Sequence, residues 1–168
     1  MHPTSETSTE RSTTLGLAIL AFLILAGYAL ARPATESLFL AHFSSQALPT
    51  VWCAVAVATL GIVAIYSRYV SVLGLYPIFV RSVFWTSLIL VLLALTRQFG
   101  GDALAGPAVF GLYIWKDVYI VVLVEIFWSY TNTIYRAANA RWVYGLFCAC
   151  GSLGGMAGNY AGGWIAET

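Results

Sequence analysis

The 168 residues of this chain are 60% hydrophobic and only 9% charged, and their mean hydropathy is +0.83. Soluble domains carry about a quarter charged residues, so this chain has too little polar surface to cover a water-facing globule. The net charge is +1 and the basic residues are scattered, which excludes the basic patch of a nucleic-acid-binding protein. The composition therefore predicts an integral membrane protein that has the lipid bilayer as a partner.

Residues 1–14 form a polar N-terminal segment, MHPTSETSTERSTT, which is rich in Ser, Thr and Glu. It contains no aliphatic side chain after Met1, so it can bury almost no apolar surface. We predict a polar, disordered or capping tail over residues 1–14 and a transmembrane helical domain over residues 15–168.

The first apolar run covers residues 15–31 and follows Arg11. A basic flank and small residues at the end of the run also fit a cleavable signal peptide. Against that interpretation, the apolar character resumes after Arg32 and Pro33, which gives a first span over residues 15–43. A helix of about 29 residues crosses a bilayer core of ~30 Å with some tilt. We expect Pro33 to kink this helix rather than end the span.

Four further apolar runs follow, and each is close to the ~20 residues that a spanning helix needs. They cover residues 48–66, 78–96, 108–130 and 142–166. The connecting segments are short. The pattern predicts an all-α, polytopic transmembrane bundle of about five spans.

Basic residues are unevenly divided between the two sides of such a bundle. With the N-terminus inside, the cytoplasmic side holds Arg11, Arg68, Arg136 and Arg141, whereas the other side has Arg97. The positive-inside rule therefore favours a cytoplasmic N-terminus. Five spans then place the C-terminus on the opposite side.

The sequence offers little for catalysis or metal binding. Cys53, Cys148 and Cys150 lie within apolar runs, where cysteine usually behaves as a small buried hydrophobe, so we expect no disulfide and no metal site. G-x-S-x-G and H-E-x-x-H motifs are absent, and the histidines are His2 and His42. We expect neither an enzyme nor a cofactor.

The last predicted helix carries glycines at a regular spacing. Gly154, Gly158 and Gly162 recur every four residues, and Gly151 and Gly155 lie beside them. Such a face lets a neighbouring helix approach the backbone closely. The spacing predicts a helix-packing face and by itself carries no information on transport.

Charged residues inside the spans are more informative, because each costs about 2.5 kcal/mol or more at the bilayer centre unless it faces protein or water. Arg32 and Glu36 are four residues apart, so they share a face of the first helix and can pair. On the fourth helix one stripe at helical spacing comprises Asp117, Val121, Glu125, Trp128 and Asn132.

Two intramembrane cations are expected at a similar depth. Measured from the outer helix ends, Lys116 lies roughly 12 Å and Arg32 roughly 16 Å deep. This favours a polar cavity between the first and fourth helices, with Tyr28, Tyr113, Trp115 and Trp128 as aromatic walls. The candidate substrate-binding residues are Arg32, Glu36, Lys116, Asp117, Glu125, Trp128 and Asn132. The alternative is that the four charges at positions 32, 36, 116 and 117 neutralise one another across a helix interface.

Three stretches of the sequence resemble a known family. They are FLILAGYALARPATESLFL at residues 22–40, the FW-x-x-x-N pattern of Phe127, Trp128 and Asn132, and RWVYGLFCACGSLGGMAG at residues 141–158. Together they resemble the N-terminal half of bacterial major facilitator superfamily transporters of the ATP/ADP translocase, or nucleotide exchanger, type. The resemblance covers about residues 22–163.

This resemblance implies a bacterial inner membrane protein that works by alternating access, with substrate near the midplane between two six-helix halves. Two features depart from the family. Thr35 occupies the place of a lysine between Arg32 and Glu36, and the acid at the start of the fourth helix has no clear counterpart beside Lys116 and Asp117. The chain also ends after the fifth predicted helix, so we expect that it cannot enclose a pathway alone.

Two hypotheses of function follow. In the first, the chain is a transporter-derived accessory or structural subunit that packs against other membrane protein subunits of a larger assembly. In the second, it is a half-transporter that pairs with a second half and moves a small anionic solute. Loss of the second half favours the first hypothesis, and the retained intramembrane charges favour the second.

Overall fold

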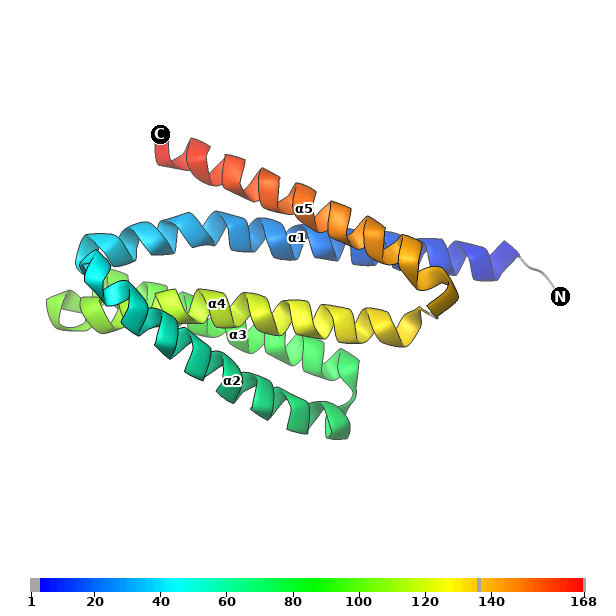
Figure 1. Cartoon of the computed structure of the whole chain (residues 1–168), viewed down its shortest axis with the longest axis horizontal. Helices are drawn as coiled ribbons and strands as arrows, with labels where there is room; N and C mark the ends of the chain where they lie inside the picture. Colours follow the sequence, from blue (N-terminus) through cyan, green and yellow to red (C-terminus); the bar gives the residue numbers. More distant parts are fainter. Residues whose placement is uncertain (1–3, 136, 168) are drawn as a thin grey trace. The chain divides into compact units, whose positions relative to one another are not determined.

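The computed structural model describes residues 4–135 and 137–167, and α-helices account for nearly all of them (Figure 1). The side chains of residues 4–10, 69–73, 75–76, 137–140 and 167 lie outside this description. A 3₁₀ turn, η1 (Ser45–Ala47), joins the first two helices. The α-helices are α1 (Thr4–His42), α2 (Leu48–Leu73), α3 (Leu75–Phe99), α4 (Gly101–Ile134) and α5 (Ala137–Glu167). The expected all-α architecture with five long helices is confirmed.

The helices begin earlier and end later than the apolar runs. α1 begins at Thr4, so residues 4–14, expected as a disordered or capping tail, continue the helix. Once residues 15–42 are helical, each residue added to the end gains a hydrogen bond without a new nucleation cost. α1 also continues through Pro33, as expected for a span that this proline does not end.

Glycine makes the connections shorter than the sequence predicts. α2 and α3 are separated by Gly74 alone, at φ 76°, and α4 begins at Gly101, at φ 68°. These left-handed backbone conformations favour glycine, so one residue ends one helix and starts the next. Pro77 then falls in the first turn of α3, where a missing N–H costs nothing.

Three segments are long and apolar enough to cross a membrane: Arg11–His42, Ser45–Arg68 and Pro77–Phe99. They indicate a membrane-embedded protein. The sequence predicts two further crossings, by α4 and α5, which are not among these segments. α4 carries the charged residues Lys116, Asp117 and Glu125, and α5 is rich in glycine.

The chain divides into two compact units, where the sequence predicts one domain over residues 15–168. Unit 1 comprises Met1–Leu30 and Thr131–Thr168, and unit 2 comprises Ala31–Tyr130. α1 and α4 therefore contribute to both units. Each unit has its own buried core.

The core of unit 2 has two clusters, and both include residues of α4. In the first, Phe39 of α1 and Val51 of α2 pack on Val109 and Tyr113. In the second, Ile78 of α3 packs on α4 residues at a four-residue spacing, namely Val118, Val122 and Ile126. Because both clusters use α4, this helix is the central element of unit 2.

The core of unit 1 is a close contact between α5 and the first part of α1, which run in the same direction (Figure 1). A Cβ at Gly154 would overlap with the carbonyl oxygen of Phe22, and one at Gly158 would overlap with that of Ala26. Gly151 lies against Leu25. Backbone contact at this range is possible only where side chains are absent.

Gly155 does not belong to this contact, and the packing role of Gly162 stays a prediction. An added Cβ at Gly155 would meet nothing within 4 Å, and Gly162 is half-buried. The face that touches α1 therefore follows positions 151, 154 and 158.

Candidate functional site

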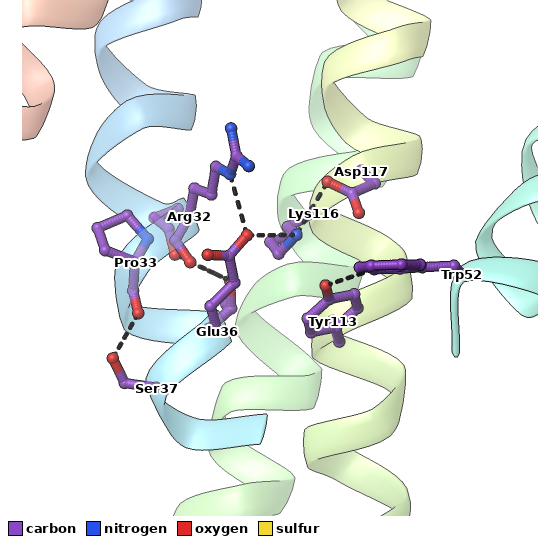
Figure 2. Close-up of polar contacts among 10 residues, drawn as sticks. Arg32, Pro33, Glu36, Ser37, Trp52, Tyr113, Lys116 and Asp117 are labelled. Carbon is purple, nitrogen blue, oxygen red and sulfur yellow. Dashed lines mark hydrogen bonds and ion pairs between the residues drawn. The ribbon is translucent and has the colours of Figure 1, made fainter. Parts of the chain in front are cut away.

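Four charged side chains of unit 2 form a chain of ion pairs between α1 and α4 (Figure 2). The Nε of Arg32 lies 3.0 Å from Oε1 of Glu36. The same Oε1 lies 4.0 Å from Nζ of Lys116, and that Nζ lies 2.9 Å from Oδ1 of Asp117. Two cations and two anions therefore compensate one another within one cluster.

Lys116 is the most buried member of this cluster, because only 2% of its side chain is exposed. Its ammonium also lies 4.1 Å from the ring centroid of Tyr113. A cation above an aromatic face is attracted by the ring quadrupole, and more strongly where water is excluded. Two carboxylates and one ring thus replace water around the ammonium.

The other three members of the cluster are more exposed than Lys116. The exposed fraction of the side chain is 23% for Asp117, 38% for Glu36 and 57% for Arg32. Attraction within an ion pair is stronger where the surroundings are less polar, so the Lys116–Asp117 pair holds the cluster together more than the Arg32–Glu36 pair does. Arg32 is the member that a solute or partner would meet first.

The α1 segment that presents Arg32 and Glu36 is shaped by Pro33. Proline has no N–H, so this turn lacks one helical hydrogen bond. The hydroxyl of Ser37 donates to the Pro33 carbonyl at 2.7 Å, and that of Thr35 approaches the carbonyls of Ala31 and Arg32, each at 3.0 Å. Short polar side chains thus bond back to the backbone around the proline.

Thr35 itself is buried, and its hydroxyl is used by its own helix. It therefore takes no part in the ion-pair cluster that Arg32 and Glu36 join on either side of it.

Tyr113 is held in place by contacts from α1 and α2. The indole Nε1 of Trp52 on α2 donates to its hydroxyl at 3.1 Å (Figure 2), and the ring of Phe39 lies 4.7 Å away between centroids. Because Tyr113 is buried and contacted by α1 and α2, its ring is a fixed wall for the ammonium. Tyr113 was expected only as an aromatic wall of the cavity.

The other predicted site residues are not brought into this cluster. Glu125 is exposed, and so is Val121 of the same predicted stripe. Trp128 packs edge-on against Phe127, with ring centroids 5.4 Å apart. Asn132 belongs to unit 1, where its Oδ1 accepts a hydrogen bond from the hydroxyl of Tyr144.

A cavity in unit 2 lies among α2, α3 and α4 rather than at the charged cluster. Its volume is about 410 Å³, and none of the four charged residues lines it. Trp115 is one of its walls, and the Trp115 indole donates to the carbonyl of Thr86 at 2.9 Å. The structure brings Arg32, Glu36, Lys116 and Asp117 together, and the polar cavity with all seven predicted residues stays a prediction.

Metal binding finds no support in the described part of the chain, which contains no group of three or more His, Cys, Asp or Glu side chains able to hold an ion. Cys53, Cys148 and Cys150 are free thiols. The site chemistry that the described residues offer is charge compensation.

No protein-family model, curated protein or solved structure matches this chain. The resemblance to the nucleotide exchangers accordingly stays a prediction from the three sequence stretches that carry it.

Proposed function

We propose that this chain is a structural subunit of a larger membrane assembly, with five crossings and a cytoplasmic N-terminus in a bacterial inner membrane. In this proposal the charges of α1 and α4 stabilise the helix interface and do not bind a transported solute. Other membrane protein subunits are the partners.

The main support for the proposal is the environment of Lys116. Its ammonium is buried and lies between Glu36, Asp117 and the ring of Tyr113. A cation that is already compensated by two carboxylates would have to break those contacts before it could bind an anion. Buried ion pairs of this kind are costly to separate, because each charge is then left in a medium of low polarity.

Exposed apolar faces support the assembly part of the proposal. Large hydrophobic side chains are exposed on α2, α3 and α5, and among them are Trp52, Leu60, Phe84, Met156 and Trp164. Lipid or another membrane subunit must cover these side chains, since water would not.

Reconstitution of the purified chain into liposomes tests the proposal. We expect no uptake of phosphate, carboxylate or nucleotide anions above that of protein-free liposomes. We also expect the chain to migrate in a particle larger than its 18.2 kDa monomer when native membranes are dissolved in mild detergent. Anion uptake by the chain alone would contradict the proposal.

The second candidate function is a half-transporter for a small anionic solute, and the exposure of Arg32 favours it. A guanidinium that is 57% exposed can reach an anion without loss of the buried pair. In this case Arg32→Gln abolishes uptake while the protein accumulates normally. Arg32→Gln combined with Glu36→Gln then keeps the yield but stays inactive. In the structural case Arg32→Gln lowers the yield, and the double variant restores it because neither charge is left unpaired.

A further inference from the structure

Unit 1 contains a groove that the proposed function does not use. It has a volume of about 1150 Å³ and lies between the first turns of the membrane segment of α1 and the start of α5. We call it the α1–α5 groove. The side chains that matter here are Arg11, Thr14 and Leu15 of α1, and Arg141 and Leu146 of α5. Among the described residues that line it, none is acidic.

The two arginines lie at the same end of unit 1. α1 and α5 are parallel, with Gly154 against Phe22. At 1.5 Å per residue, Arg141 lies about 20 Å and Arg11 about 17 Å before that crossing point. Both side chains are exposed, and in the described part of the chain neither joins one of the ion pairs. Two exposed cations therefore flank one groove.

The floor of the groove is apolar below these cations. Leu15 is 63% exposed within the groove, and Ala18 and Leu146 continue the apolar surface along the helices. Beside them the Thr14 hydroxyl is hydrogen-bonded to that of Tyr135 at 2.7 Å. The groove thus has two cations at one end and an apolar surface beyond them. A ligand with an anionic group and an apolar chain, that is, an anionic amphiphile, would fit both parts.

The position of Arg11 decides what kind of amphiphile this is. Arg11 is the first residue of a segment that is apolar enough to cross the membrane, so its guanidinium belongs at the level of the lipid headgroups. Basic pockets between transmembrane helices at this level bind anionic lipid headgroups. A soluble phosphate would use the guanidiniums but leave the apolar floor uncovered.

We infer that the α1–α5 groove binds an anionic phospholipid, whose phosphate lies between Arg11 and Arg141 and whose acyl chain lies along Leu15 and Leu146. The inference does not rest on the ion-pair cluster of unit 2 and stands whether the chain is a structural subunit or a half-transporter.

Titration of the delipidated full chain in mild detergent tests this inference, with bound lipid counted by native mass spectrometry. Dioleoyl phosphatidylglycerol is the probe, and dioleoyl phosphatidylcholine is the control with identical acyl chains. We expect the anionic lipid to bind at least tenfold more tightly, because in phosphatidylcholine the headgroup cation offsets the phosphate charge and repels the two guanidiniums. Glycerol 3-phosphate at millimolar concentration should not displace the lipid.

Single variants locate the site. Arg11→Gln and Arg141→Gln should each weaken phosphatidylglycerol binding about tenfold and leave phosphatidylcholine unchanged. Arg68→Gln is the matched control, because Arg68 is exposed and does not line the groove. Leu15→Asn should weaken both lipids, since it removes apolar surface from the floor.

Three results would overturn the inference. Equal binding of the two lipids would mean that the groove holds ordinary boundary lipid. Displacement by glycerol 3-phosphate would mean that the arginines bind soluble phosphate. Unchanged binding in both arginine variants would place the lipid elsewhere. If a variant fails to accumulate, the comparison of the three ligands on the wild-type chain still decides.

Discussion

Lys116 shows how a single charged residue is accommodated inside this chain. Taking an ammonium out of water costs several kcal/mol unless other groups replace the water. Asp117 at 2.9 Å, Glu36 at 4.0 Å and the Tyr113 ring at 4.1 Å are those groups. Since the nearest of them is a carboxylate that is itself largely removed from water, each partner depends on the other.

Removal of Lys116 should therefore destabilise the chain more than removal of Arg32. Lys116→Met leaves the Asp117 carboxylate without its nearest cation, and we expect a loss of about 3 kcal/mol. Arg32→Gln affects a largely exposed pair and should cost less than about 1 kcal/mol. Thermal unfolding in detergent, followed by circular dichroism, measures the difference.

The double variant Lys116→Met with Asp117→Asn is the control, because it leaves neither charge in place. It should recover most of the stability that Lys116→Met loses. A double variant as unstable as the single one would show that the ammonium matters through Glu36 or Tyr113 and not through Asp117.

Tyr113 offers a separate test of the cation–π contact. Tyr113→Phe keeps the ring over the ammonium and loses the hydrogen bond from Trp52, at a cost of about 1 kcal/mol. Tyr113→Leu also loses the ring and should cost roughly a further 1–2 kcal/mol in unfolding free energy. Tyr160→Leu, at an 82% exposed tyrosine, controls for loss of an aromatic ring. Equal stability of the Phe and Leu variants would rule out a role for the ring face.

Part of the charged cluster can be predicted from the sequence, because it depends on spacing. Arg32 and Glu36 are four residues apart, and side chains at that spacing meet on a helix. Lys116 and Asp117 are neighbours, which do not face each other, and their contact depends on the long lysine side chain turning back toward Asp117. Glu125 shares the helical stripe of Asp117, but packing buries the Val118 and Ile126 face of α4 instead.

At the scale of the helices, the contact of α5 with α1 is set by which glycine faces the neighbour. Gly154 and Gly158 lie against backbone carbonyl groups, whereas Gly155, next to Gly154 in the sequence, faces open space. Regular spacing predicts that such a face exists. The face that touches α1 follows from the crossing of two helices far apart in sequence, which spacing alone does not contain.

This difference makes a matched pair of substitutions possible. Gly154→Ala places a methyl group on the Phe22 carbonyl and must push the helices apart, so we expect a loss of about 1–3 kcal/mol in unfolding free energy. Gly155→Ala adds the same methyl group in open space and should be neutral or stabilising by up to about 1 kcal/mol, since alanine favours a helix over glycine. The melting temperatures of the two variants in the same detergent measure the effect. A Gly154→Ala variant as stable as Gly155→Ala would mean that α5 does not pack on α1 through this face.

Helix ends were less predictable than helix number. Five apolar runs correspond to five helices, but Gly74 and Gly101 let helices continue to within one or two residues of each other. Hydropathy marks the part of a helix that lipid can surround, and backbone hydrogen bonds continue beyond it as long as no residue interrupts them. The α1–α5 groove also cannot be predicted from the sequence. Arg11 and Arg141 line one groove only because α1 and α5 pack in parallel.

At the scale of the whole chain, the direction of the helices bears on how many of them cross the membrane. Phe22 and Ala26 lie within the candidate span Arg11–His42, and they contact Gly154 and Gly158 of α5. This contact supports the proposal that α5 lies at the membrane depth of that span. Since α5 is parallel to α1, a spanning α5 would begin on the N-terminal side of the membrane.

The proposed five-span topology has α4 cross as well. If the spans of α1, α2 and α3 alternate in direction, α3 ends on the side opposite the N-terminus. If α5 begins on the N-terminal side, as proposed, α4 returns through the membrane to reach it. Its buried face and its compensated charges make this crossing possible despite the cost of Lys116 and Asp117.

Topology reporters test this arrangement directly. We expect a reporter at the N-terminus or inserted at Gly74 to be cytoplasmic, because Arg11, Arg68 and Arg141 lie on that side. A reporter inserted at Gly100 or fused after residue 168 should be extracytoplasmic. Alkaline phosphatase and green fluorescent protein fusions at each position measure this, since the first is active outside the cytoplasmic membrane and the second fluoresces inside it. A C-terminal fusion on the same side as the N-terminal one would mean that α4 or α5 does not cross, and the parallel contact of α5 with the α1 span could then not lie within the bilayer.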